Sequence, residues 1–103
     1  MHPDDGVAVF REIVAQHERG GADDALILDG IDHSDRATLS AEDLARSLAR
    51  LEAAGCIERR GGRWLVAAAL VDALPRTRSG ALTTGSEAWR RFAEARIRPL
   101  FWH

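Results

Sequence analysis

The chain has 103 residues, of which 46% are hydrophobic and 29% are charged, as in ordinary globular domains. This length accommodates one hydrophobic core, so we expect a single domain over residues 1–103. No apolar run approaches the roughly 20 residues that a membrane-spanning helix requires, and the acidic start does not resemble a secretory signal. Cys56 is the only cysteine, which excludes an internal disulfide and favours a reducing, cytoplasmic location.

Charge is distributed unevenly along the chain. Residues 1–58 contain 13 acidic side chains and 5 arginines, whereas residues 59–103 contain 3 acidic side chains and 9 arginines. These segments carry formal charges of −8 and +6, which sum to the net charge of −2. Such an asymmetry suggests a face that binds a polyanion, and arginine is the side chain best suited to phosphate.

Two helices are predicted in the first third of the chain. A Pro-Asp-Asp run at residues 3–5 indicates a helix start that is capped by an aspartate. Apolar residues at helical spacing continue until a glycine pair at residues 20–21 ends the helix. A second helix is capped by Asp23 or Asp24 and runs through Ile31, and Gly30 together with the polar run of residues 32–36 ends it. It is apolar on almost all sides, so we expect it to be the most buried element.

The clearest local signals lie between residues 40 and 67. Ser40 followed by Asp43 is a capping-box pattern, and the leucine stripe behind it predicts a helix over residues 40–54. Gly55 suits the helix stop, because glycine adopts the left-handed conformation without a Cβ clash. Strands are predicted over 56–60 and 63–67, with the glycine pair between them as a two-residue hairpin turn.

The stretch after the hairpin is less regular. Residues 68–74 suit either a continued strand or one or two helical turns, and residues 81–83 suit a short third strand. Thr84 and Glu87 repeat the capping-box spacing, which predicts a last helix over about residues 86–98.

Helix, glycine stop, strand, tight turn and strand is the order in which a winged helix-turn-helix ends. We therefore predict an α+β fold of this type, with about four helices and a two-stranded β-wing. The connection between the second and third helices, at about seven or eight residues, is longer than the 3–4 residues of a strict DNA-reading turn.

The same motifs resemble bacterial winged-helix proteins. Residues 44–66 contain a Leu-x-x-Leu-x-x-x-Gly-x-Ile core and a Gly-Gly-Arg-Trp turn, similar to their third helix and wing. Residues 82–89 are similar to the segment entering the final helix of the multiple-antibiotic-resistance and phenolic-acid-decarboxylase repressor families. Residues 31–33 (Ile-Asp-His) and 39–44 match the layout of small bacterial winged-helix proteins. This resemblance covers about residues 8–90 and implies the fold.

The first candidate site is a nucleic-acid interface on the third helix and the wing. In a helix-turn-helix the recognition helix enters the major groove, and outward-facing arginines are suited to phosphate. Glu42 and Asp43 oppose this interpretation, because they place two carboxylates at the start of that helix. The alternative is an ordinary solvated face. The candidate residues are Arg46, Ser47, Arg50, Arg59, Arg60 and Arg63.

The second candidate is a protein interface formed by the last helix and its tail, residues 86–103. This segment is rich in aromatic residues and arginine, which are enriched at interfaces. We expect Trp89 and Phe92 to lie inside, with Phe101 and Trp102 across the two-fold axis of a homodimer. The alternative is that the stripe completes the monomer core. The candidate residues are Trp89, Phe92, Ile97, Leu100, Phe101 and Trp102.

The sequence contains candidate residues for a metal site and for a catalytic site, but a structural role fits them better. Asp29, Asp32, His33 and Asp35 could contribute ligands to a divalent ion, but aspartates are also common at helix ends and turns. Cys56 with a histidine base, either His17 or His33, would form a nucleophilic pair, yet a structural thiol under the wing fits better. We expect no metal, no cofactor and no enzymatic activity.

The function predicted from sequence is therefore that of a winged-helix DNA-binding protein with a transcription-regulator-like role. Its expected partners are double-stranded DNA and a second copy of the chain. The alternative is a winged helix that serves as a protein–protein interaction module without DNA binding, which the acidic first half of the chain favours.

Overall fold

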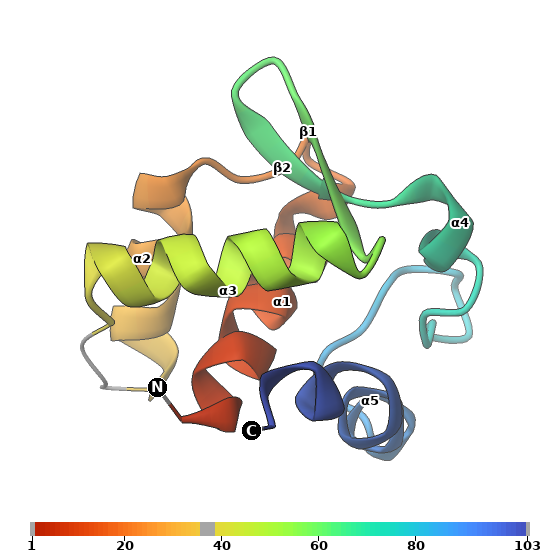
Figure 1. Ribbon diagram of the computed structural model, residues 1–103. Coiled ribbons are helices and arrows are strands. Elements are labelled where there is room, and N and C mark those ends of the chain that lie inside the picture. The colour runs from red at the N-terminus through yellow and green to blue at the C-terminus, as the bar shows by residue number, and fades with distance from the viewer. Residues whose placement is uncertain (1, 36–38, 103) are drawn as a thin grey trace.

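The computed structural model describes residues 2–35 and 39–102, without the side chains of residues 33–35. Within these residues the chain forms five α-helices and a two-stranded antiparallel sheet, so the fold class is α+β (Figure 1). The order of three helices followed by a hairpin is compatible with a winged-helix layout. The elements are α1 (Pro3–His17), α2 (Asp24–Asp35), α3 (Ala41–Ala53), β1 (Ile57–Arg60), β2 (Arg63–Val66), α4 (Ala68–Val71) and α5 (Glu87–Phe92). A π-helical turn (Ala93–Ile97) and a 3-10 turn (Arg98–Phe101) follow α5.

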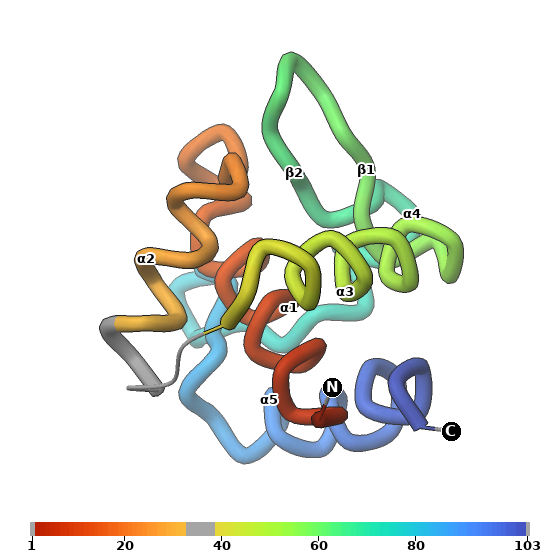
Figure 2. Tube along the Cα trace, turned by 60° about the vertical axis from the view of Figure 1, so that its left-hand side comes forward, coloured from red at the N-terminus to blue at the C-terminus, as the bar shows by residue number. Residues whose placement is uncertain are grey.

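Helix α1 is the centre of the core. It packs against α2, α3, β2 and the turns that follow α5, and Figures 1 and 2 show α3 lying across it. Its apolar face is closed to solvent because Phe10 and Ile13 are fully buried. The prediction that the second helix is the most buried element is wrong. Helix α2 buries Ile27 and Ile31 against α1, but it leaves Leu26 40% exposed because it lies at the edge of the core.

Four helix starts can be compared with their predicted caps. Of the two aspartates predicted for α2, Asp23 is the cap, because its Oδ1 atom accepts a hydrogen bond from the Leu26 N–H at 2.8 Å. Helix α3 is capped as predicted, because the Ser40 hydroxyl accepts a hydrogen bond from the Asp43 backbone N–H at 3.1 Å. Helix α1 is capped by His2 rather than by an aspartate, since the His2 Nδ1 atom accepts from the Asp4 N–H at 3.1 Å. Helix α5 is capped by Ser86 rather than Thr84, because the helix begins two residues later than the Thr84 pattern implies.

Helix α2 continues through Gly30 to Asp35, whereas the sequence predicts that Gly30 and the polar run of residues 32–36 end it. A Cβ at Gly30 would overlap the carboxylate of Glu12 on α1, so the missing side chain lets the two helices approach closely. The connection to α3 consequently shortens to residues 36–40, which is less than the predicted seven or eight. Residues 36–38 of that connection lie outside the described part of the chain.

The hairpin has the predicted turn and register. Gly61 and Gly62 have φ angles of 56° and 79°, which only glycine adopts readily at both positions of such a turn. The strands pair antiparallel, with Ile57 opposite Val66 and Arg60 opposite Arg63. A third backbone segment, absent from the sequence prediction, joins this sheet. Ala22 exchanges two hydrogen bonds with Trp64, at 3.0 and 2.7 Å.

The stretch after the hairpin is helical at its start. Of the two alternatives for residues 68–74, the helical one is correct, because α4 is a short turn from Ala68 to Val71. The short third strand predicted over residues 81–83 is reduced to one isolated bridge between Arg76 and Leu82. No helix within the described residues is both long and apolar enough to cross a membrane.

Candidate nucleic-acid interface

The β1–β2 hairpin projects away from the helices and exposes its tip (Figure 1). Side chains alternate between its faces, so Arg60 and Arg63 share one face while Arg59 and Trp64 share the other. All three arginines are exposed. The tight glycine turn therefore places three exposed arginines close together in sequence at the end of the hairpin.

Each of these arginines has a different environment. The Arg59 guanidinium lies 5.4 Å from the centre of the Trp64 ring, and this ring is fixed by its indole N–H, which donates to Asp24 at 3.2 Å. Arg60 forms an ion pair with Glu58 at 3.0 Å. Arg63 has no carboxylate partner among the described residues. Arg59 and Arg63 are thus available to an anionic ligand without breaking an ion pair, whereas Arg60 must first leave Glu58.

The α1–α2 turn lies beside this tip. A Cβ built at Gly20 would lie 3.8 Å from the Arg63 guanidinium, which places the turn against that side chain. Arg19, the residue before Gly20, is exposed and has no ion pair with a described residue. This turn adds a fourth arginine to the surroundings of the hairpin, one that was not predicted as a site residue from the sequence. In the sequence Arg19 is marked only by its position just before the glycine pair that ends the first helix. It lies far along the chain from Arg63, so their proximity was not predictable.

The three candidate residues on α3 differ in burial and in the groups that already engage them. Ser47 is fully buried, so its assignment to the outer face is wrong. It lies three residues after Leu44 and four before Leu51, and both spacings place it on the same helix face as these core leucines. Arg46 is paired with Glu42 and lies 3.9 Å from the Asp43 carboxylate. Arg50 donates to the Leu100 carbonyl at 3.1 Å, which ties α3 to the C-terminal 3-10 turn.

The exposed face of α3 consists mostly of short side chains, and its formal charge is close to zero. Its charged members Glu42, Arg46 and Glu52 sum to −1. The other exposed residues on the helix are alanines at positions 41, 45, 49 and 53. Such a face has few side chains long enough to reach base edges, and the acidic first turn would repel phosphate. The structure therefore separates the predicted interface into an open hairpin half and a closed helix half.

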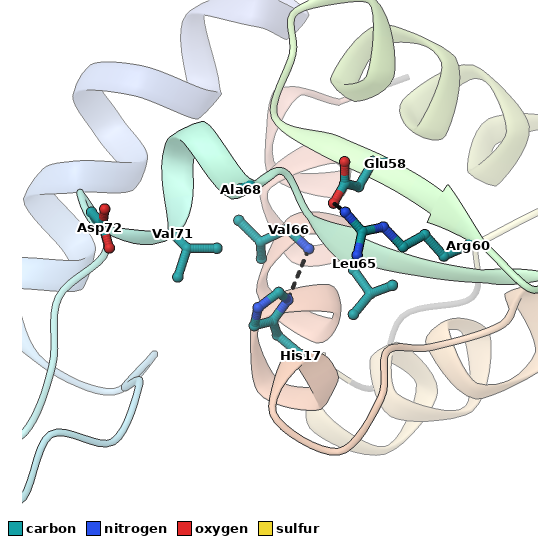
Figure 3. Close-up of a pocket in the computed structure, with 8 residues that line it drawn as sticks. All are labelled: His17, Glu58, Arg60, Leu65, Val66, Ala68, Val71 and Asp72. Atoms are coloured by element: carbon teal, nitrogen blue, oxygen red, sulfur yellow. Dashed lines mark hydrogen bonds and ion pairs between the residues drawn. The ribbon is translucent and has the colours of Figure 1, made fainter.

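A hollow of about 300 Å³ lies on the face of the hairpin that carries Arg60 (Figure 3). Its wall includes His17 at the end of α1, whose Nδ1 atom accepts a hydrogen bond from the Val66 N–H at 3.1 Å. This nitrogen must hold a lone pair, so the neutral ring carries its proton on Nε2. His17 therefore anchors β2 to α1 and fixes the direction of the hairpin. The hollow is lined by His17, Glu58, Arg60, Leu65, Val66, Ala68, Val71 and Asp72.

The anchoring role of His17 differs from the one considered from sequence, where it was a base for Cys56. Cys56 is buried, and this burial raises the pKa of its thiol above the ordinary value of 9.0, while Arg96 acts weakly in the opposite direction. The thiolate is the nucleophilic form. A buried thiol of raised pKa is a poor nucleophile at neutral pH, so Cys56 functions as a small core residue.

The predicted protein interface is mostly inside the molecule. Trp89, Ile97 and Phe101 are buried, and Phe101 covers Gly6 so closely that a Cβ there would overlap its ring. The placement of Phe101 across a two-fold axis is therefore wrong, because its ring fills the space that Gly6 leaves on α1. Phe92 and Leu100 are half-buried against the core, and Trp102 alone of the six is mostly exposed, at 60%.

The aspartate–histidine cluster considered for a metal lies partly outside the described residues. The side chains of His33 and Asp35 fall in that undescribed part, so only Asp29 and Asp32 can be placed, and both are exposed on α2. Among the residues that the structure does describe, no group of three potential ligands comes together in a way that could hold a metal ion.

Comparison of the chain with protein-family models, with curated proteins and with solved structures found no match.

Proposed function

We propose that this protein is a winged-helix protein that binds double-stranded DNA through its wing, the β1–β2 hairpin, in a transcription-regulator-like role. The observation that carries the proposal is the exposed tip with Arg59, Arg60 and Arg63 around the tight Gly61-Gly62 turn. Phosphate contacts supply most of the affinity of such interfaces, and arginine is suited to form them. The anchor from His17 to Val66 supports this role, because it holds the wing in one direction relative to the helices.

The wing, rather than α3, carries the contact in this proposal. The outer face of α3 sums to −1, and its arginines are engaged by Glu42 and by the Leu100 carbonyl. Sequence is read by side chains that reach base edges, whereas phosphate contacts carry no sequence information directly. We therefore expect binding that tolerates many sequences and depends steeply on salt.

The test measures binding of the full chain to two unrelated duplexes by fluorescence anisotropy at 50 mM salt. We expect similar affinities for both duplexes and a large loss in the wing variant Arg59→Ala, Arg60→Ala, Arg63→Ala. A matched control replaces Arg78, Arg90 and Arg91 with alanine, which removes the same charge from exposed sites outside the hairpin. Equal losses in the two triple variants would show that net charge, and not the wing, determines binding.

A second candidate function is that of a protein-interaction module, and the face of α3 favours it. Exposed alanines at positions 45, 49 and 53 form a strip of short side chains on α3, so another helix can approach it closely. Absence of duplex binding at 50 mM salt by a chain with native circular dichroism would favour this candidate over the first.

A further inference from the structure

The outer surface of α2 is apolar and hollowed. Among the described residues, the exposed large hydrophobic side chains are Trp102, at 60%, and Leu26, at 40%. Two shallow hollows of about 380 and 480 Å³ flank it and share Ala25 and Asp29 in their walls. Leu28 and Leu39 form the apolar floor of the first hollow and are themselves only half-buried. This surface is large enough and apolar enough to bind one large apolar side chain.

The rim of this surface is acidic. Residues 23–32 contain four aspartates and no basic residue, a formal charge of −4. Asp23 and Asp29 border one hollow, and Asp29 and Asp32 border the other. Asp29 and Asp32 have no ion pair with a described residue. A fitting partner therefore presents an apolar side chain together with basic groups.

The basic C-terminal segment, residues 87–102, has that chemistry. It contains four arginines and two glutamates, a formal charge of +2. Trp102 is mostly exposed, so it does not cover α2 of its own chain, and the preceding backbone is held by the hydrogen bond from Arg50 to the Leu100 carbonyl. Arg96 is exposed and has no carboxylate partner among the described residues.

We propose that the α2 surface of one copy binds the Trp102 side chain of a second copy. The acidic rim of α2 meets Arg96 of the second copy, because the other three arginines of that segment are paired with Glu87, Glu94 or Asp4 of their own chain. The contact joins two different surfaces, the α2 surface of one copy and the C-terminal segment of the other. This inference does not depend on DNA binding, and a chain that binds no DNA would still self-associate in this way.

The first experiment measures the mass of the full chain by sedimentation from 10 to 500 μM at low salt. We expect a mass above the monomer value of 11.3 kDa that decreases as salt is added. Leu26→Ser and Trp102→Ala should each be monomeric, because each removes one side of the contact. Arg78→Ala, an exposed change outside both surfaces, should associate like the wild type. Circular dichroism of each variant confirms that it is folded.

The decisive step mixes the two single variants. The Leu26→Ser variant retains Trp102, and the Trp102→Ala variant retains an intact α2 surface. An equimolar mixture should therefore form a heterodimer of twice the monomer mass. An interface in which Leu26 packs against Leu26 of the second copy, or Trp102 against Trp102, would not be restored by such mixing. The proposal is overturned if the wild-type chain is monomeric at 500 μM, if either variant associates like the wild type, or if the mixture remains monomeric.

Discussion

Gly6→Ala tests how the C-terminal turns close the core. Phe101 is fully buried, and a Cβ at Gly6 would overlap its ring. The ring has no solvent-side space to move into without leaving the core, and loss of a buried Phe costs about 3–5 kcal/mol. Alanine is favoured over glycine inside a helix by about 1 kcal/mol. We therefore expect a net loss of about 2–4 kcal/mol in the free energy of unfolding.

The measurement is urea unfolding followed by far-ultraviolet circular dichroism, performed as a double-mutant cycle with Phe101→Ala. In the Phe101→Ala background the overlap is absent, so Gly6→Ala should become stabilising by up to about 1 kcal/mol through helix propensity alone. Gly30→Ala is the control, because its Cβ would overlap the Glu12 carboxylate and not the Phe101 ring, so its effect should be the same with and without that ring. An equal cost of Gly6→Ala with and without the Phe101 ring would refute the packing described for this turn.

Three further predictions concern the hairpin and the core. His17→Ala should cost about 1–3 kcal/mol by leaving the Val66 N–H without its acceptor; slower hydrogen exchange of the Val66 amide in the variant than in the wild type would contradict this. Gly62→Ala should cost about 1–2 kcal/mol because its φ is positive, whereas Gly85→Ala, at a position without positive φ or close neighbours, should cost less in the same thermal melts. Burial raises the pKa of the Cys56 thiol above 9.0, so the folded chain holds this proton more tightly than the unfolded chain. Its contribution to stability is complete below pH 9.0 and is lost as pH rises above it, and Cys56→Ala should remove that alkaline component from the pH dependence of urea unfolding.

Local signals between residues 40 and 66 predicted their structure well. The Ser40 cap, the Gly55 stop and the glycine turn of the hairpin each depend on residues within one helical turn or one hairpin loop. The exposure of Arg59, Arg60 and Arg63 followed from the same turn. The burial of Ser47 was also encoded locally, in its spacing from the core leucines, although the interpretation placed it outside.

Features that depend on distant contacts were not predictable in the same way. The close approach of α2 to α1 is made where Gly30 meets Glu12, and the third segment of the sheet depends on Ala22 meeting Trp64. Arg50 is engaged by a hydrogen bond to the Leu100 carbonyl, which lies 50 residues further along the chain. Hydrophobic periodicity alone gives α2 an apolar character, but only the packing against α1 decides which of its sides is covered.

The most direct test of wing-mediated DNA binding is the salt dependence of the association constant of the full chain with a generic duplex. If the three wing arginines each neutralise one phosphate, they contribute a slope of about −2.7 in a plot of log K against log salt concentration. We predict that the wing triple variant loses about this much slope, while the triple variant at Arg78, Arg90 and Arg91 retains the wild-type value. An unchanged slope in the wing variant, or no binding by the wild type at 50 mM salt, would contradict the proposed function.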